Sequence, residues 1–447
     1  MTTRPWREPC PGVGYRAGGQ EPRSPYRGST TRGSLFSSAR RSGFFRSPLH
    51  TSGVQGSVLV RVLAVLVLLL VAGTAAGVVL LWPENREIPR PPELGAAPDT
   101  EKAEIVGVRS TACGLGAGRD DCLEVTAELR SGPDEGEEVT FTFAAAEGEF
   151  DVGDDIRVFK NAPLDAPPDP LTEGIEIEPY SFSDFERRTP MLGLVVMFVA
   201  LVLLTGRWQG FRALLGLCGS LAVIVFFIVP AILDGRSPIA VAFVGALAIM
   251  LITLPLAHGA GPKTIAASLG TAASLTLTLV LGYFFIDLTH LSGVSSEEAV
   301  YLRATQGDLS LRGLLLAGMV IAALGVLDDL TVSQSSTVMA LRRANPSLGF
   351  GGLFRSAVTV GHDHIAATVN TLVLAYAGAS LPVLLIFSLA DTPFADAINF
   401  EAVAETVVAT LVGSIGLIAA VPITTALAAL LASSVEPEAL SEVGHAH

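Results

Sequence analysis

Residues 314–341 read LLLAGMVIAALGVLDDLTVSQSSTVMAL, and the first half of this segment is typical of a membrane helix. The adjacent carboxylates Asp328 and Asp329 then end the apolar run, and several Ser, Thr and Gln residues follow. A carboxylate at membrane depth costs roughly 2.5–3.5 kcal/mol on insertion scales. We therefore expect either that this half of the helix faces a wet or protein-lined interior, or that the pair changes protonation during function.

The composition indicates an integral membrane protein. Half of the 447 residues are hydrophobic, only 16% are charged, and the mean hydropathy is +0.53. These values lie well away from those of soluble globular proteins. The net charge is −14, and residues 83–188 alone hold 26 acidic against 10 basic residues. This distribution excludes nucleic-acid binding.

The N-terminal region combines a basic tail with a first span. Residues 1–56 contain nine Arg against two Glu and predict a disordered cytoplasmic tail. Residues 57–82 follow as the first transmembrane helix, because the apolar run 62–82 is long enough to cross about 30 Å of hydrocarbon. We expect this helix to remain uncleaved, although the small residues at 74–77 leave cleavage open.

Residues 83–188 predict an acidic extracytoplasmic region. Within it, about residues 101–165, four short strand candidates separated by Gly-, Asp- and Pro-rich turns predict a small β-barrel-like domain. Residues 162–178 are interpreted as a linker. A disulfide between Cys113 and Cys122 would help so small a core, and free thiols are the alternative. The acidic residues are interpreted as a solvated surface, with loose cation binding as the alternative.

Residues 189–433 predict a bundle of seven further helices, which gives about eight spans in an α-helical polytopic protein. The predicted inner loops hold two, one and three basic residues, and the outer turns are acidic or mixed. By the positive-inside rule, both termini are then cytoplasmic, including the tail 434–447. Residues 342–362 are expected to form an inner segment, and the seventh span is placed at about 365–389.

A second polar group lies at residues 362–364, in the sequence GHDH. A histidine beside a buried aspartate suits proton transfer, so we assign a proton or ion relay to Asp328, Asp329, His362, Asp363 and His364. HxH next to an aspartate also suits a transition metal, and a solvated interfacial cluster is the third interpretation.

Polar residues around these groups are expected to line a path. Asp329, Ser333 and Ser336 follow i, i+4, i+7 and share one helical stripe. The alternative for the hydroxyls is hydrogen bonding between membrane helices. The residues assigned to the path are Thr331, Ser333, Gln334, Ser336 and Asn370.

Two stretches, GVLDDLTVSQSSTV and GHDHIAATVNTLVLAYAGASLP, resemble the YibE/F family of bacterial multi-pass membrane proteins over most of residues 60–433. The resemblance implies a cytoplasmic-membrane location and does not imply a substrate. The helix AGMVIAALGVLDDLTVSQ also looks like the Asp-bearing helix of proton-driven RND-type permeases. That second resemblance implies a proton relay at Asp328 and Asp329.

The leading hypothesis is a secondary transporter or permease coupled to protons or a small cation. The alternative is a non-transporting assembly or export accessory protein that acts through the β domain, with protein partners unknown. A third hypothesis is an intramembrane aspartyl hydrolase that uses Asp328 or Asp329 together with Asp363, but the sequence lacks GxGD. No GxxxxGK[ST] motif is present, so we expect no ATP hydrolysis within this chain. We expect no enzyme activity and no cofactor. The expected partners are the lipid bilayer and protons or a small cation.

Overall fold

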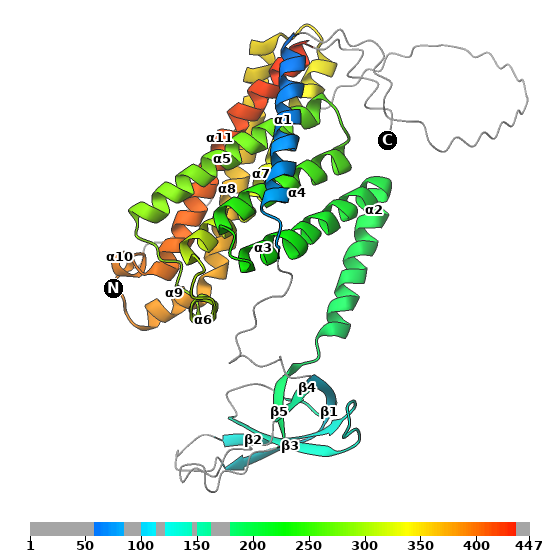
Figure 1. The fold of residues 1–447 in the computed structure, drawn as a ribbon, viewed down its shortest axis with the longest axis vertical. Helices are drawn as coiled ribbons and strands as arrows, with labels where there is room; N and C mark the ends of the chain where they lie inside the picture. Colours follow the sequence, from blue (N-terminus) through cyan, green and yellow to red (C-terminus); the bar gives the residue numbers. More distant parts are fainter. Residues whose placement is uncertain (1–57, 85–99, 113–120, 145–149, 162–178, 435–447) are drawn as a thin grey trace, which may run out of the picture. The chain divides into compact units, whose positions relative to one another are not determined.

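The computed structural model describes residues 58–84, 100–112, 121–144, 150–161 and 179–434 (Figure 1). The two predicted cytoplasmic tails, the predicted linker 162–178 and Cys113 lie outside the described residues. The described chain forms a small β domain and a helical bundle.

The β domain is one antiparallel sheet of five strands in the order β3-β2-β1-β4-β5. Alternate residues of β2 face inward, so Val125, Ala127 and Leu129 are buried. Four strands were predicted, and the fifth lies beyond the predicted end of the domain at residue 165. The strands are β1 (Thr100–Ala112), β2 (Asp121–Leu129), β3 (Glu138–Ala144), β4 (Asp155–Lys160) and β5 (Tyr180–Phe185).

The two edge strands approach each other through aromatic rings. Phe143 of β3 and Phe182 of β5 meet edge to face, with 5.3 Å between ring centroids. Phe150 stacks on Phe143 at 4.7 Å and also contacts Phe182. The described β3 and β5 are not hydrogen-bonded neighbours in the strand order. The domain is therefore a curled sheet, and the barrel closure we expected is not established. Cys122 of β2 is buried and disulfide-bonded, while its predicted partner Cys113 lies outside the described residues.

A polar triad ties the last strand to the turn before β3. The buried Tyr180 hydroxyl and the Lys160 ammonium each donate to Oδ2 of Asp134 at 2.5 Å. These hydrogen bonds, from Lys160 first and Tyr180 second, lower the pKa of Asp134. Burial and the bond to Asp134 raise the pKa of Tyr180.

We expect Tyr180→Phe to destabilise the β domain at neutral pH more than in acid. A lowered carboxyl pKa stabilises the fold above the ordinary Asp value of about 3.9, and this stabilisation is lost as the pH falls through the folded-state value. Hydrogen exchange of the β4 and β5 amides in the full chain would measure the difference. Tyr301→Phe, at an exposed tyrosine of α6, is the control. An equal effect of Tyr180→Phe at both pH values would contradict this account.

The bundle contains long helices joined by short turns. Proline in the first turn starts α4 and α5, where its missing N–H costs no helical hydrogen bond. The helices are α1 (Val58–Leu80), α2 (Arg188–Val223), α3 (Val229–Leu233), α4 (Pro238–His258), α5 (Pro262–Leu288), α6 (Glu297–Thr305), α7 (Leu311–Ala344), α8 (Phe350–Ala379), α9 (Leu381–Leu389), α10 (Phe394–Ala397) and α11 (Glu401–Ser434), with a π-helical turn, η2 (Ile224–Ile228), between α2 and α3.

Six described helical segments are long and apolar enough to cross a membrane, and the bent pair α8–α9 makes a possible seventh. Residues 188–233 count as one of the six, although the helix breaks at Arg207, whose φ is 48°. This break falls in residues 206–212, the short loop with two basic residues that the sequence predicts between the second and third spans. The predicted total of eight requires each side of the break to cross separately, and it stays a prediction.

The connection between α7 and α8 is shorter than predicted. Residues 342–362 were expected to be an inner segment, but α7 continues to Ala344 and α8 begins at Phe350. Only residues 345–349 join them, and the Arg342 guanidinium donates to the carbonyls of Pro346 and Leu348 across this turn. The helix of the seventh predicted span therefore starts about fifteen residues early, and it bends by 58° where α8 meets α9.

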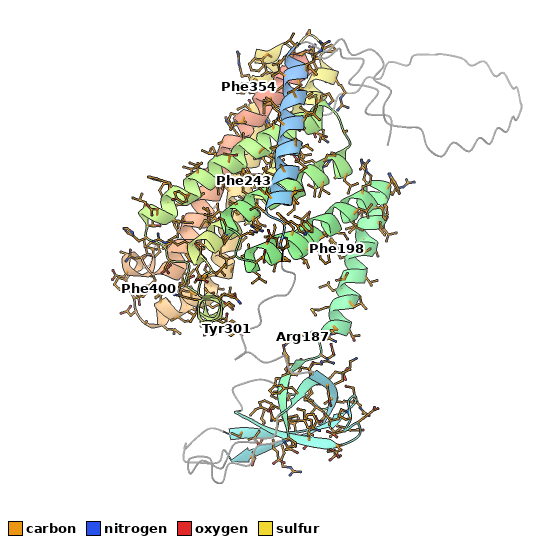
Figure 2. All side chains as sticks on the ribbon, viewed as in Figure 1. Arg187, Phe198, Phe243, Tyr301, Phe354 and Phe400 are labelled. Carbon is orange, nitrogen blue, oxygen red and sulfur yellow. The ribbon has the colours of Figure 1, made fainter. Side chains whose placement is uncertain are left out.

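Figure 2 shows Phe354, near the start of α8, and Phe400, just before α11, at opposite ends of the bundle. We call the end with Ala344 and Phe350 the inner end and the opposite end the outer end. Helices α5, α7 and α11 pack against one another (Figure 1). Twelve of the thirteen buried polar residues described lie on these three helices: Thr264, Ser268, Thr271, Ser274, Thr278, Thr331, Gln334, Ser335, Thr410, Ser414, Thr424 and Thr425.

Candidate functional site

The first span provides a measure of depth for the Asp-bearing helix. Leu63, near the start of α1, belongs to the same buried cluster as Met339 of α7. At the other end, Trp82 stacks on Phe227 with 5.9 Å between ring centroids. Asp328 precedes Met339 by 11 residues, which is about 16 Å along a helix. Asp328 thus lies well inside the membrane-length helix α7, and it bonds Thr253, which precedes the end of α4 at His258.

Asp328 faces helix α4 and is only partly satisfied. Thr253 Oγ1 donates to Oδ2 of Asp328 at 3.3 Å. The other oxygen, Oδ1, is buried and has no hydrogen-bond partner. An unpaired carboxylate oxygen in a buried position is costly, so this group is suited to holding a proton or a cation.

Asp329 points in a different direction, as expected for the next residue on a helix. Its side chain is exposed at the surface of the bundle. Its charge acts on His258 at the end of α4, and Lys263 and Arg212 act on the same imidazole. The two aspartates thus have separate environments: Asp328 bonds Thr253 within α4, and Asp329 acts on His258 at the end of α4.

An exposed stripe of small residues leads along α7 to Asp329. Gly318, Ala322 and Gly325 precede Asp329 at helical spacing, and all four are exposed. No atom outside their own turns of helix lies within 4 Å of where a Cβ would stand on Gly318 or Gly325. This small-residue stripe therefore leaves open space along the helix on the outer side of Asp329.

The hydroxyl and amide residues after the Asp pair hold helices together. Gln334 is buried, and its Nε2 donates to Ala357 O of α8 at 2.7 Å and to Thr425 Oγ1 of α11 at 2.8 Å. Thr331 Oγ1 lies 2.7 Å from Thr271 Oγ1 of α5. Both residues were assigned to a path, and the structure places both in helix contacts.

The rest of the predicted path is more exposed. Ser336 Oγ donates to Val332 O of its own helix at 2.7 Å, and its side chain is partly buried. Ser333 is partly buried one turn beyond Asp329, and Asn370 is exposed on α8. Ser333 is therefore the residue of the predicted set that extends the small-residue stripe past Asp329.

The GHDH motif lies within α8, where a position at the mouth of a span was predicted. Gly361 is buried, and a Cβ there would lie 3.1 Å from Gln334 Oε1, so the motif lies at the depth of Gln334. His362, Asp363 and His364 are all exposed on the helix surface. Within the described ranges, no hydrogen bond or ion pair joins them to Asp328 or Asp329.

A metal site receives no support from this geometry. Among the described residues, no three His, Cys, Asp or Glu side chains come together in a way that could hold a metal ion. The transition-metal interpretation of GHDH therefore has no observation in its favour.

Sequence reasoning missed Thr253 as the partner of Asp328. The signal available was weak, since Thr253 is the only hydroxyl residue within the apolar helix α4. Which helix faces Asp328 depends on tertiary packing, so no spacing within the chain indicates it.

Comparison with protein families covers the bundle. The model of the YibE/F-like protein family matches residues 194–434, which is more than half of the chain. The chain belongs to the YibE/F-like family. This match confirms the resemblance predicted from the two motifs, and it includes Asp328, Asp329 and the GHDH segment. The YibE/F-like match begins in α2, so the β domain and α1 lie outside it. No curated protein and no solved structure matches the chain.

Proposed function

We propose that this YibE/F-like protein is a secondary transporter of the bacterial cytoplasmic membrane, driven by protons or a small cation, with both termini in the cytoplasm. The observation that supports the proposal is the Asp pair within the membrane-length helix α7. Asp328 keeps one buried oxygen without a partner, and Asp329 is exposed at the end of the small-residue stripe. Ionisable groups retained within transmembrane helices are characteristic of proton and ion pathways.

The two aspartates have different roles in this proposal. Asp329 receives the coupling ion from the open side of α7, where small residues leave space. Asp328, held by Thr253 on α4, changes its interaction with that helix when it gains or loses charge. A change of charge at this contact would change how strongly α7 packs against α4. Ion binding would then favour one arrangement of the two helices over another, as coupled transport requires.

His258 and the GHDH motif extend the relay toward the inner end. The charge of Asp329 acts on His258, which also lies near Lys263 and Arg212, and an imidazole can accept and release a proton. We assign ion release at the inner side to His258, and we retain His362 and His364 as a second exposed pair at the depth of Gln334.

Proton flux in proteoliposomes tests the proposal. Purified protein is reconstituted with an internal pH-sensitive dye, and a pH gradient is imposed. We expect Asp329→Asn and Asp328→Asn each to lower protein-dependent flux at least tenfold, because the amide cannot carry the proton. Gly325→Leu, which fills the small-residue stripe, should lower flux without changing thermal stability.

The matched control is Asp287→Asn. Asp287 lies near the outer end of α5, its side chain is 77% exposed, and it pairs with Arg312 at 3.8 Å. This variant should keep wild-type flux. Unchanged flux in both Asp328→Asn and Asp329→Asn, with normal folding, would refute the relay. The accessory hypothesis, in which the β domain is the working part, would then remain.

A further inference from the structure

A cavity at the outer end of the bundle contains a second incompletely bonded carboxylate. Its volume is about 390 Å³, and its walls come from residues 293–299, α7, α8 and α11. This volume falls within the range of small-molecule sites in proteins. We call it the Glu405 cavity, after the acidic residue in its wall.

Glu405 is bonded through one oxygen only. Ser295 Oγ donates to Oε2 of Glu405 at 2.5 Å. The other oxygen, Oε1, is buried and lacks a hydrogen-bond partner. The neighbouring Glu401 differs, because its Oε1 accepts the backbone N–H groups of Ser292 at 2.5 Å and Gly293 at 2.9 Å. Glu401 therefore holds the backbone of residues 292–293, whereas Glu405 keeps one oxygen, Oε1, that could accept a hydrogen bond from a ligand.

The remaining walls define what could bind. Leu314, Leu315 and Met319 give an apolar side, and Tyr376 adds an aromatic ring. No lining residue is Lys or Arg, so an anion finds no counter-charge. Glu405 is the one acid among the described residues of the lining. Even with the nearby Glu401, whose charge acts on it, the two carboxylates offer too few oxygens for Ca²⁺, which takes six to eight. An apolar body with one positive charge satisfies the carboxylate, the aliphatic wall and the ring together.

We propose that the Glu405 cavity binds an organic monocation, an amine or quaternary ammonium with an apolar body, with Glu405 as its counter-ion. The proposal names a substrate class and so rests on the proposed transport function. The two are linked by Gly318, which lines the cavity and also begins the small-residue stripe that leads to Asp329. A cation released from the cavity along this stripe would reach Asp329 about 16 Å further along α7.

Equilibrium binding tests the cavity without requiring transport. Radiolabelled tetraphenylphosphonium is titrated against the purified full chain in detergent, with triphenylphosphine oxide as the uncharged competitor. We expect saturable binding that the uncharged compound does not displace. Glu405→Gln should weaken binding at least tenfold. Gly318→Leu should also weaken it, because the new side chain fills the cavity while meeting no atom within 4 Å at its Cβ.

Asp396→Asn is the control, since Asp396 is an exposed acid near the outer end that does not line the cavity. It should bind like the wild type, and thermal unfolding should show all variants folded. Absence of saturable binding by the wild type, or wild-type affinity in Glu405→Gln, would overturn the cation site. Asp328→Asn and Asp329→Asn should retain binding while losing flux. Binding with unchanged flux in those variants would refute the transport proposal alone.

Discussion

Gly270→Ala is expected to destabilise the protein by about 1–3 kcal/mol, although alanine normally favours a helix. Gly270 of α5 packs directly on Thr424 of α11. A Cβ at position 270 would lie 2.1 Å from Thr424 Oγ1, 3.0 Å from its Cβ and 3.2 Å from its Cα. Rotation of the threonine side chain about χ1 would move its hydroxyl and methyl groups but not its Cα and Cβ, so the two helices would have to separate.

Thermal unfolding in detergent measures this effect against Gly378→Ala. Position 378 of α8 has no atom within 4 Å of an added Cβ, so that change should be neutral or stabilise by up to about 1 kcal/mol. We therefore expect the melting temperature to fall in Gly270→Ala and to stay the same or rise in Gly378→Ala. Equal melting temperatures for both variants would show that α5 and α11 do not pack this closely.

Gln334→Glu should destabilise the bundle by about 3–5 kcal/mol at neutral pH. The Gln334 amide donates to Ala357 O and Thr425 Oγ1, and a carboxylate there would place a negative charge against a carbonyl oxygen. Burial disfavours the charged form of the introduced acid. Its destabilising effect should then be absent below the ordinary Glu pKa of about 4.3 and grow as the pH rises above it.

Gln334→Leu is the matched variant, because it keeps the volume without adding charge. It removes the hydrogen bonds to Ala357 O and Thr425 Oγ1, while the Thr425 hydroxyl keeps its own donation to Val421 O at 2.6 Å. Its cost should be smaller and independent of pH. Melting curves at pH 4 and pH 7.5 would distinguish the two variants. A Gln334→Glu protein as stable as Gln334→Leu at pH 7.5 would contradict the three-helix contact.

The helical character of the bundle could be predicted because apolar runs of membrane length dominate the sequence. The Asp pair was found for the same reason, since charges inside an apolar run are conspicuous. The start of α8 was missed because Arg355, His362 and Asp363 make its first half polar. A helix that is polar on one face and buried on the other falls below a hydropathy criterion.

Other features depend on contacts that sequence spacing does not encode. Strand β5 follows an acidic segment, and its alternation of Tyr180 and Phe182 with serine is only a short signal. The bond from Thr253 to Asp328 joins residues 75 positions apart. Glu405 resembles any acid near a helix start until Ser295 and the cavity are seen beside it. In each case packing selected one partner among many chemically similar residues.

The five-residue turn between α7 and α8 has a mechanical consequence. The guanidinium of Arg342 fastens that turn, so the two helices are hinged together at their inner ends. If α8 rotates relative to α7, the displacement between the two helices increases with distance from this turn. The largest excursion would occur beyond Tyr376, where the chain already changes direction by 58°.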